Sequence, residues 1–320
     1  TEIYTLSLHD ALPICKKNRR TNDFYGRWNF KNRHRVCCCG RFFSTDIQMN
    51  RMNDEMLKTR KPVNDEKVPL KVKFATLGCR VNQYETQAVR EEFLRACYEE
   101  TADSKQADVF VLNTCTVTRE SDKESRYLIR KFHRENPAAK IIVTGCYVER
   151  DRKEVEAIPG VTLTVFNREK SEMVRLLESC ASFLPVSDEP ISKRRFTPLS
   201  ISEFEGRTRA YVKIEDGCNH ACSFCKVVLV RGPVRSRPFE EIVEEVKRLS
   251  ANGYGEVVLT GIQLGAFGFD QGKQKKLPEL LSALDAMKEV KRIRLSSIEP
   301  TDVTDELIDR MSQSRKICPH

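Results

Sequence analysis

The sequence predicts an α/β protein with two parallel sheets in succession: a flavodoxin-like (Rossmann-type) sheet and then an incomplete (β/α) barrel. From residue 71 onward, apolar runs of strand length alternate with amphipathic runs of helix length. This alternation is typical of parallel sheets, because a helix usually carries the chain back between parallel strands. The chain has 320 residues, which is enough for about two domains with cores of their own.

The first predicted unit, residues 71–180, is an α/β domain in which three strands each run toward a cysteine. An amphipathic helix is expected over residues 86–100 and a charged helix over 119–136. Right-handed crossovers would place the strands in one sheet, with their carboxyl ends at a common edge. The expected strands cover residues 71–79, 107–115 and 139–146.

The second predicted unit, residues 207–320, follows a proline-containing stretch, 181–206, that is typical of a linker. It repeats the order strand then helix, as in barrels whose chemistry lies on the loops after the strands. Gly253 is expected to follow the end of one helix, and Thr304 to cap the start of another. The expected strands are 209–217, 256–262 and 292–300, and the expected helices are 239–253, 277–290 and 304–314.

Composition and charge narrow the possible function classes. The net charge of +9 is concentrated in the first 70 residues, so it is weak evidence for nucleic-acid binding. The sequence contains neither an apolar run of membrane-spanning length nor a secretory leader, so we expect a cytoplasmic protein without membrane contacts. In a reducing compartment, 13 cysteines favour metal or redox chemistry over disulfides.

Residues 1–70 show neither helical nor strand periodicity, and we expect them to be unstructured. The segment YTLSLHDALPI, residues 4–14, resembles a sequencing adapter read as protein. It indicates a gene-assembly artefact followed by translated upstream sequence. A disordered basic tail that contacts RNA is the alternative. The run Cys37-Cys38-Cys39 is not interpreted as a metal site, because adjacent cysteines rarely have room to chelate one ion together.

Cys79, Cys115 and Cys146 each lie just beyond the end of a predicted strand. The carboxyl ends of parallel strands share the edge at which α/β folds bind ligands, so these three thiols are expected to converge. The alternative is three unrelated buried cysteines, which is common for single residues but less so at three equivalent strand ends. Cys97 and Cys180 lie in helical patterns and are interpreted as small core residues.

Cys218, Cys222 and Cys225 follow the first strand of the second unit with the spacing C-x3-C-x2-C. Three thiolates can ligate three irons of a [4Fe-4S] cluster and leave the fourth iron open. S-adenosylmethionine (SAM) can chelate such an iron through its amino and carboxylate groups, and an electron from the cluster can then break its sulfonium C–S bond. A structural zinc site with His220 as fourth ligand is the alternative. It is disfavoured because structural zinc sites normally draw their ligands from two separated pairs.

The motifs of residues 71–320 resemble those of the radical SAM tRNA methylthiotransferases. Resemblance to the family's amino-terminal domain rests on TLGCRVNQYETQ, NTCTVTRESDKESR and VTGCYVE. Resemblance to its radical domain rests on YVKIEDGCNHACSFC, RGPVRSRP, VVLTGIQLGAFGFD and RLSSIEP. It is nearly continuous over about 250 residues. GCRVNQYET and the TCTVT motif are most similar to the branch that acts on N6-threonylcarbamoyladenosine. The isopentenyladenosine branch comes second, and the branch that modifies a ribosomal protein comes third.

This resemblance implies two [4Fe-4S] clusters, SAM as cofactor and tRNA as substrate. The ligands of the radical-generating cluster match Cys218, Cys222 and Cys225. Those of an auxiliary, sulfur-delivering cluster match Cys79, Cys115 and Cys146. The implied reaction replaces C2–H of the adenosine just 3′ of the anticodon, tRNA position 37, with a methylthio group. One SAM supplies the methyl group, and another yields a 5′-deoxyadenosyl radical. An electron donor and a sulfur source are further partners, and we expect a monomer.

Two pairs of residues at strand ends are candidate contacts of SAM. Thr260 and Gly261 end the second barrel strand, where backbone can approach the methionine part of the cofactor. A tight turn between strand and helix is the alternative. Ser297 and Glu299 end the third strand and can face polar groups of the cofactor. Helix capping or a loop ion pair is the alternative for this pair.

Arg231, Arg235 and Arg237 follow the cysteine loop, and Arg237 is a further candidate cofactor contact. Arginine suits bidentate contacts with a carboxylate or an RNA phosphate, and a solvated basic loop is the alternative. The charged helix from Arg119 to Arg134 is a candidate tRNA contact, although faces of mixed charge are usually just solvated.

Two features depart from the family's pattern. KVVLVRG follows Cys225, where the family has an apolar stretch with proline and an aromatic residue. The Lys226 ammonium is therefore expected to alter the local field and the cluster potential. The chain also stops at KICPH, at the start of a fourth strand. The remaining barrel and a small RNA-binding β-domain are expected to be absent, which predicts a truncated, poorly soluble and largely inactive chain with an exposed strand edge.

Three hypotheses about function follow. The first is an iron–sulfur methylthiotransferase of the radical SAM type. The second, from a different class, is a metal-stabilised RNA-binding module without catalysis, whose tRNA binding would weaken with salt. The third is a non-functional fragment.

Overall fold

The computed structural model describes residues 68–179, 191, 195–220, 222–272 and 276–319. The predictions for residues 1–67, which include the adapter-like segment and the run of three cysteines, lie outside the described residues, as does the one for Cys180. Residues 65–320 cluster as one unit, and its described part contains two parallel sheets.

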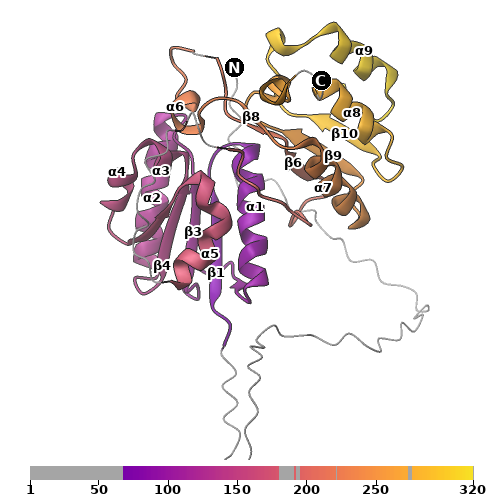
Figure 1. Ribbon diagram of the computed structural model, residues 1–320. Helices are drawn as coiled ribbons and strands as arrows, with labels where there is room; N and C mark the ends of the chain where they lie inside the picture. The colour runs from indigo at the N-terminus through magenta and orange to yellow at the C-terminus, as the bar shows by residue number, and fades with distance from the viewer. Residues whose placement is uncertain (1–67, 180–190, 192–194, 221, 273–275, 320) are drawn as a thin grey trace, which may run out of the picture. The chain divides into compact units, whose positions relative to one another are not determined.

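The first sheet has five parallel strands in the order β2-β1-β3-β4-β5, and Figure 1 labels β1, β3 and β4. This order is that of flavodoxin-like folds, the class of sheet that the sequence predicts. The central strands β3 (Val109–Thr114) and β4 (Lys140–Gly145) are apolar and buried, as expected for strands covered on both faces. β1 (Lys71–Thr76) corresponds to the first of the three predicted strands, over residues 71–79. The sequence prediction misses the edge strands β2 (Glu99–Glu100) and β5 (Val161–Val165).

Helices connect these strands. α2 (Arg119–Glu135) agrees with the predicted charged helix, and its cap Thr118 accepts a hydrogen bond from the Ser121 backbone N–H at 3.1 Å. α1 (Arg80–Arg95) begins before the predicted start at residue 86, because its first turns bury polar side chains that hydrophobic periodicity does not register. The remaining helices of this sheet are α3 (Cys146–Arg150), α4 (Arg152–Glu156), η1 (Asn167–Glu172) and α5 (Met173–Glu178).

The interpretation of Cys97 as a core residue is wrong. α1 ends at Arg95, and Cys97 lies in the following turn with a φ of 64° and an exposed side chain. The core position in this turn belongs to Tyr98, whose ring packs edge-on against Phe93 with centroids 5.0 Å apart. The helical pattern of apolar residues runs past the end of the helix, and the prediction therefore runs past it too.

The second sheet contains β6 (Ala210–Lys213), β9 (Glu256–Thr260) and β10 (Arg292–Leu295) in parallel, with β9 in the middle. A parallel bridge joins Ile317 to Ile293, so the predicted start of a fourth strand is confirmed. The helices that follow these strands are α7 (Phe239–Ala251), α8 (Leu277–Asp285) and α9 (Asp305–Gln313). Short 3-10 turns occupy η3 (Leu264–Ala266), η4 (Phe269–Gln271) and η5 (Pro300–Asp302).

Both predicted helix ends in this unit are confirmed. Gly253 follows α7 with a φ of 97°, a conformation that glycine adopts without strain. Thr304 Oγ1 accepts a hydrogen bond from the Leu307 backbone N–H at 3.2 Å and so caps α9. None of the helices in the described ranges is long and apolar enough to cross a membrane.

A short antiparallel ribbon encloses the loop that carries Cys218. β7 (Glu215–Asp216) pairs with β8 (Arg235–Ser236), and α6 (Val227–Arg231) lies between them in the sequence. The sequence predicts one strand over 209–217, but the structure divides it into β6 and β7. A β-carbon on Gly217, whose φ is 96°, would lie 2.0 Å from the carbonyl oxygen of Pro233. Only glycine therefore lets the two ends of the loop approach this closely.

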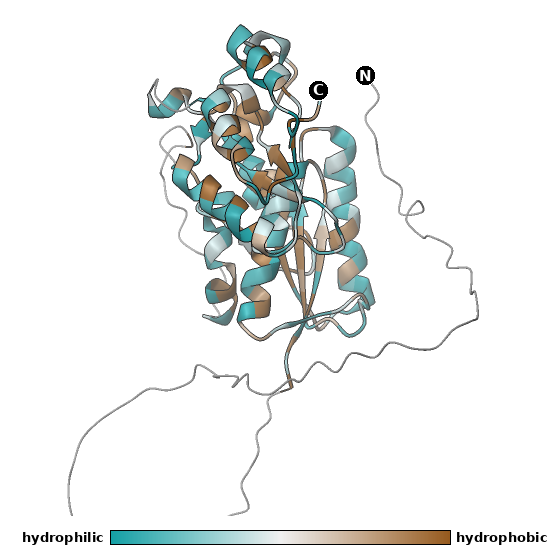
Figure 2. Cartoon of the chain, turned by 90° about the vertical axis from the view of Figure 1, so that its right-hand side faces the viewer, coloured by the Kyte–Doolittle hydropathy of each residue, from teal (hydrophilic) through white to brown (hydrophobic). Residues whose placement is uncertain are grey.

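α1 contributes to the cores of both sheets. Val89 and Phe93 pack in the core of the first sheet, whereas Tyr84 and Ala88 pack with the strands and helices of the second. Figure 2 shows the corresponding pattern of hydropathy, with mostly brown strands and with helices that carry both brown and teal residues.

Part of the predicted linker is packed against α1. The Ser202 backbone N–H donates to Glu91 Oε1 at 2.8 Å, and the carbonyl oxygen of Leu199 accepts from the Tyr84 hydroxyl at 2.8 Å. Leu199 and Ile201 are buried in the core of the second sheet. This stretch is therefore part of the folded unit.

Candidate functional site

The first triad, Cys79, Cys115 and Cys146, lies where the carboxyl ends of β1, β3 and β4 meet. Cys115 and Cys146 directly follow β3 and β4, and Cys79 stands at the amino end of α1, shortly after β1. Because β3 lies between β1 and β4 in the sheet, the three residues share one edge. The structure therefore brings them together as predicted, while their role as ligands stays a prediction.

Two glycines make this close arrangement possible. Gly78 has a φ of 97°, and a β-carbon there would lie 2.9 Å from Cys115 Cβ and 3.1 Å from its Sγ. Gly145 has a φ of 101°, and a β-carbon there would lie 2.4 Å from the carbonyl oxygen of Thr114. A side chain at either position would push the cysteine-bearing segments apart, so glycine is required by both conformation and space.

The thiols of the first triad are close enough to influence one another. Burial raises the pKa of the Cys115 thiol, and Cys146 adds to this rise. Burial also raises the pKa of the Cys146 thiol, and Cys79 adds to that rise. The Arg231 guanidinium opposes it, because its Nε–H donates to Cys146 Sγ at 3.4 Å. Since iron binds the thiolate, loading this site requires these protons to leave.

The second triad, Cys218, Cys222 and Cys225, lies on the loop between β7 and β8. Cys218 and Cys225 are partly buried, and Cys222 is exposed. The Cys218 backbone N–H donates to the carbonyl oxygen of Gly232 at 3.0 Å, which closes the base of the loop. Burial raises the pKa of the Cys218 thiol, whereas the His220 backbone N–H, 3.4 Å from its Sγ, opposes the rise.

His220 contacts Gln263 in the structure. Its Nε2 lies 2.9 Å from Gln263 Nε2, and Gln263 Oε1 accepts a hydrogen bond from the Asn219 backbone N–H at 3.0 Å. The His220 ring is thus engaged at the end of β9, which disfavours its use as a fourth zinc ligand. Gln263 fixes the cysteine loop against the second sheet. The sequence around Gln263 does not predict this role, because no local pattern marks a contact between residues 43 positions apart.

The cysteines in the described ranges are all free. Within the same ranges, no group of three or more His, Cys, Asp or Glu side chains is arranged to hold a metal ion.

Glu85 of α1 is fully buried and surrounded by cations. Arg231 Nη1 and Lys213 Nζ lie 2.6 and 2.7 Å from its Oε1, and Lys170 Nζ pairs with its Oε2. Burial would raise the pKa of Glu85, but Arg231, Lys170 and Lys213 hold it well below its usual range. Buried carboxylates are stable only with such partners, so this cluster fixes α1 against β6 and α6.

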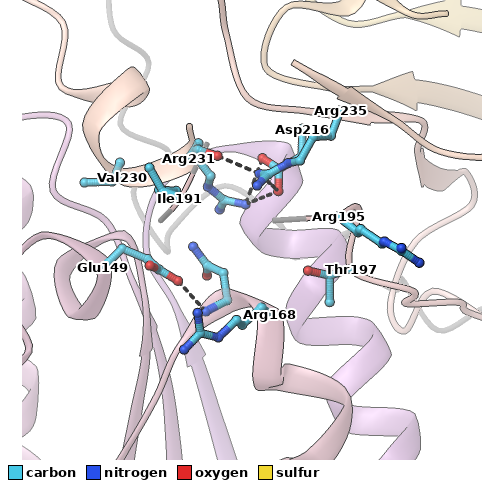
Figure 3. A pocket seen from close by; sticks show the side chains of 10 residues that line it. Glu149, Arg168, Ile191, Arg195, Thr197, Asp216, Val230, Arg231 and Arg235 are labelled. Atoms are coloured by element: carbon cyan, nitrogen blue, oxygen red, sulfur yellow. Dashed lines mark hydrogen bonds and ion pairs between the residues drawn. The ribbon is translucent and has the colours of Figure 1, made fainter. Parts of the chain in front are cut away.

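Arg231 is predicted to bind an external carboxylate or phosphate, but in the structure its partners lie within the chain and include two carboxylates. Besides Glu85 it contacts Asp216, whose two carboxylate oxygens each lie 3.3 Å from Arg231 Nη1. Figure 3 shows the side chains of Arg231 and Asp216 pointing toward each other, with Arg235 beside them. Arg235 Nη2 lies 3.6 Å from Asp216 Oδ2 and donates to the Arg231 carbonyl oxygen at 2.6 Å.

Glu215 lies in β7, shortly before Cys218 in the sequence, and it binds the backbone that follows β9. Its Oε2 accepts hydrogen bonds from the backbone N–H groups of Ile262 and Gln263 at 2.7 and 2.8 Å. A β-carbon on Gly261 would lie 2.5 Å from the same oxygen, so the glycine gives Glu215 its space. Burial and the neighbouring Asp216 raise the pKa of Glu215 to about 8. No local sequence pattern marks Glu215 as a functional residue.

The other predicted SAM contacts lie at the ends of β9 and β10. Thr260 is buried as the last residue of β9. Ser297 and Glu299 are exposed beyond β10, and Ser297 lines an open pocket with Arg80 and Ser296. The Ser296 hydroxyl is buried without a hydrogen-bond partner. Ser296 is therefore a further candidate polar contact of SAM, which the sequence alone does not indicate.

Arg237 is buried between α1 and α7. Its Nη2 pairs with Glu245 Oε2 at 2.9 Å, and its Nη1 donates to the Tyr84 hydroxyl at 3.2 Å. Burial opposes its charge, but Tyr84 and Glu245 raise the pKa of the guanidinium. These contacts favour a role in packing over the cofactor contact that the sequence suggests.

Lys226 and the charged side chains of α2 form ion pairs with residues of the same chain. Lys226 Nζ lies 3.9 Å from Asp122 Oδ2, so its charge is partly balanced within the chain. On α2, Lys123 pairs with Glu120 at 2.7 Å, and both side chains are exposed. These pairs favour a solvated face of mixed charge for this helix.

Two protein-family models match the chain, and each matches the region of one parallel sheet. Residues 71–167 match the uncharacterized protein family UPF0004, and residues 212–317 match the radical SAM superfamily. The first match covers β1 to β5, and the second runs from β6 to the bridge at Ile317.

Several curated relatives carry the names of tRNA-modifying enzymes. The threonylcarbamoyladenosine tRNA methylthiotransferase MtaB of Bacillus subtilis is 42% identical over 257 residues, which cover 78% of this chain and 56% of that protein. Its namesake from Chlamydia pneumoniae is 38% identical, with coverages of 77% and 55%. A tRNA-2-methylthio-N(6)-dimethylallyladenosine synthase of Pelagibacter ubique is 29% identical, with coverages of 78% and 58%. The chain thus spans about half the length of the curated relatives it matches.

Among solved structures, the fold is similar to the radical SAM methyltransferase TsrM from Kitasatospora setae with cobalamin and a [4Fe-4S] cluster bound. The TM-score is 0.53 at 14% identity, over 77% of this chain and 59% of that one. The same enzyme with tryptophan and a SAM analogue bound gives a TM-score of 0.52 over 76% of this chain and 57% of that one, also at 14% identity. At this identity the likeness concerns the fold alone.

Proposed function

Because this chain belongs to the family of radical SAM methylthiotransferases, we propose that it takes part in adding a methylthio group to C2 of N6-threonylcarbamoyladenosine at tRNA position 37. The observation that carries the proposal is that each of the two matched regions holds one cysteine triad after its strands: the first follows β1, β3 and β4, and the second lies on the loop that follows β6 and β7. The carboxyl ends of parallel strands form the edge at which α/β folds place their ligands.

We assign the first triad to an auxiliary cluster, and two features around the thiols support this assignment. Gly78 leaves beside Cys115 Sγ a space that a β-carbon would fill. The Arg231 guanidinium faces Cys146 Sγ, and a buried cation suits anionic thiolate ligands. The assigned ligands are Cys79, Cys115 and Cys146.

We assign the second triad to the radical-generating [4Fe-4S] cluster. Cys218, Cys222 and Cys225 supply three thiols on a loop whose base is closed at Gly232. When bound, a cluster with one open iron supplies the electron that splits SAM and starts the radical reaction. Gln263 holds the loop in place through its contacts with Asn219 and His220.

The ends of β9 and β10 are the proposed SAM-binding edge. Thr260 and Gly261 offer backbone groups there, and Ser297 and Glu299 offer exposed polar side chains beside a pocket. The unpartnered hydroxyl of Ser296 is an additional candidate. Arg237 would act indirectly, by fixing the ribbon against α1 and α7.

The proposed partners are tRNA, an external electron donor and a sulfur source. We propose that the activity is cytoplasmic, as a tRNA substrate would suggest. We propose that the chain acts as a monomer.

The test is product analysis by mass spectrometry. The chain is reconstituted anaerobically with iron and sulfide, and is incubated with SAM, dithionite and tRNA that carries N6-threonylcarbamoyladenosine or N6-isopentenyladenosine. We expect a methylthio product on the threonylcarbamoyl nucleoside, together with 5′-deoxyadenosine, and we expect neither from Cys222→Ala. Tight tRNA binding without 5′-deoxyadenosine would instead identify a non-catalytic RNA-binding module.

A second candidate substrate is N6-isopentenyladenosine, which the relative from Pelagibacter ubique favours at 29% identity. The same assay separates the two substrates. Modification of the isopentenyl tRNA alone would overturn the threonylcarbamoyl assignment and leave the radical chemistry intact.

A further inference from the structure

Arg231 is a buried arginine whose guanidinium is held from three directions at the first triad. Its Nη1 pairs with Glu85 Oε1 at 2.6 Å, and its Nη2 donates to Asn82 Oδ1 at 2.6 Å. Its Nε–H donates to Cys146 Sγ at 3.4 Å. Because only 1% of the side chain is exposed and both terminal nitrogens are engaged, the Nε–H has a fixed direction toward the sulfur.

The backbone of the same segment serves the second triad. The carbonyl oxygen of Gly232, the next residue, accepts the hydrogen bond from Cys218 that closes the cysteine loop. The carbonyl oxygen of Arg231 itself accepts from Arg235 at 2.6 Å, which ties the segment to β8. Residues 231 and 232 therefore touch one triad through a side chain and the other through backbone.

We propose that Arg231 is a positioning residue for the auxiliary cluster, in that it orients Cys146 Sγ and raises the reduction potential of the cluster by donating a hydrogen bond to this sulfur. The inference rests on the proposed function, which assigns Cys79, Cys115 and Cys146 as ligands. Hydrogen bonds to ligand sulfurs are among the factors that set the potential of iron–sulfur clusters. A cationic donor stabilises the reduced, more negatively charged state, and so raises the potential.

Arg237 is a matched control for Arg231. Both arginines are buried, both lie in ion pairs with a glutamate, and both contact α1. Arg237 donates to the Tyr84 hydroxyl, whereas Arg231 reaches a thiol. The change from arginine to lysine keeps a cation in both places, but only at residue 231 does it remove a donor to sulfur.

The experiment uses a chain with Cys218, Cys222 and Cys225 changed to Ala, so that only the auxiliary cluster can form. This parent, its R231K variant and its R237K variant are reconstituted with iron and sulfide. Iron per chain is measured, and the midpoint potential is determined by redox titration followed by electron paramagnetic resonance. We expect about four irons in each protein. We also expect a more negative potential for R231K and the parent potential for R237K.

The outcomes separate this inference from the proposed function. A parent without iron would overturn the assignment of Cys79, Cys115 and Cys146 and the inference with it. If R231K binds the full amount of iron but has the parent's midpoint potential, the inference is wrong and the proposed function stands. The same holds if R237K shifts the potential as much as R231K does. The double variant E85Q/R231Q removes the cation together with its main counter-charge, and it offers a second test with the same expected shift if R231K does not fold.

Discussion

Glu215 shows at the residue scale how the loop of the second triad is joined to the second sheet. Its Oε2 is hydrogen-bonded to the backbone after β9, while its Oε1 is buried without a partner. Burial and the charge of Asp216 raise its pKa from 4.5 to about 8. At neutral pH the folded chain therefore keeps a proton on Glu215 that the unfolded chain releases.

We predict that Glu215→Gln gains stability relative to the parent chain as pH rises. The pKa of Glu215 is higher in the folded chain than its ordinary value of 4.5, so the stability contributed by the neutral carboxyl is complete below pH 4.5. It is lost as pH rises toward about 8, by up to ~1.4 kcal/mol per pH unit. Glutamine does not titrate, so the difference between the two proteins should change over this window.

Urea unfolding of both metal-free proteins at about pH 5 and about pH 8 measures this difference. An unchanged difference in the free energy of unfolding would show that Glu215 is ionised in the folded chain over the whole range.

At the scale of elements, the approach of β3 to the turn after β4 depends on Gly145. A β-carbon there would meet the carbonyl oxygen of Thr114 at 2.4 Å, and its φ of 101° is strained for any other residue. Gly253 has a comparable φ of 97°, but no atom lies within 4 Å of where its β-carbon would be. A substitution at Gly253 would therefore introduce backbone strain alone, whereas a substitution at Gly145 would introduce both strain and a steric clash.

We predict that Gly145→Ala destabilises the fold more than Gly253→Ala does. The change at Gly253 should cost about 1 kcal/mol through strain alone. The change at Gly145 should cost roughly 1–3 kcal/mol more, because the backbone of β3 or β4 must move. Denaturant unfolding measures both, and equal costs would mean that the sheet edge is not tightly packed.

The strands and helices that show a clear local pattern of apolar residues are predicted correctly from the sequence. The apolar runs of β1, β3 and β4 lead to Cys79, Cys115 and Cys146, and this placement needs only the parallel-sheet rule. The sequence does not predict the first turns of α1, because the side chains buried there are largely polar. The residues with which these side chains form hydrogen bonds and ion pairs are distant in the sequence. Glu85, for example, pairs with Arg231 across 146 residues. A pattern of neighbours cannot show such a pair, and so Arg231 is interpreted from sequence as a site for an external anion.

At the scale of the described unit, α1 couples the two sheets through Tyr84. Its hydroxyl donates to the Leu199 carbonyl oxygen at 2.8 Å, lies 3.2 Å from Glu245 Oε2, and accepts from Arg237 at 3.2 Å. The ring packs in the core of the second sheet, although α1 follows β1 of the first. The two sheets are therefore expected to unfold together.

We predict that Tyr84→Phe costs about 1–3 kcal/mol, because it leaves buried partners without a hydrogen bond. Tyr127→Phe is the control: that side chain is an exposed residue on α2, and its change should alter stability by less than about 0.5 kcal/mol. Unfolding followed by circular dichroism should show one transition in the parent chain. Two separate transitions in the parent would contradict the coupling of the sheets by α1.

Iron content tests the assignment of two triads most directly. After anaerobic reconstitution, the parent chain should hold about eight irons. Replacing Cys79, Cys115 and Cys146 with Ala should leave about four, and so should replacing Cys218, Cys222 and Cys225. Stoichiometric zinc without iron in the parent chain, or an iron content that neither triple variant lowers, would contradict the assignment.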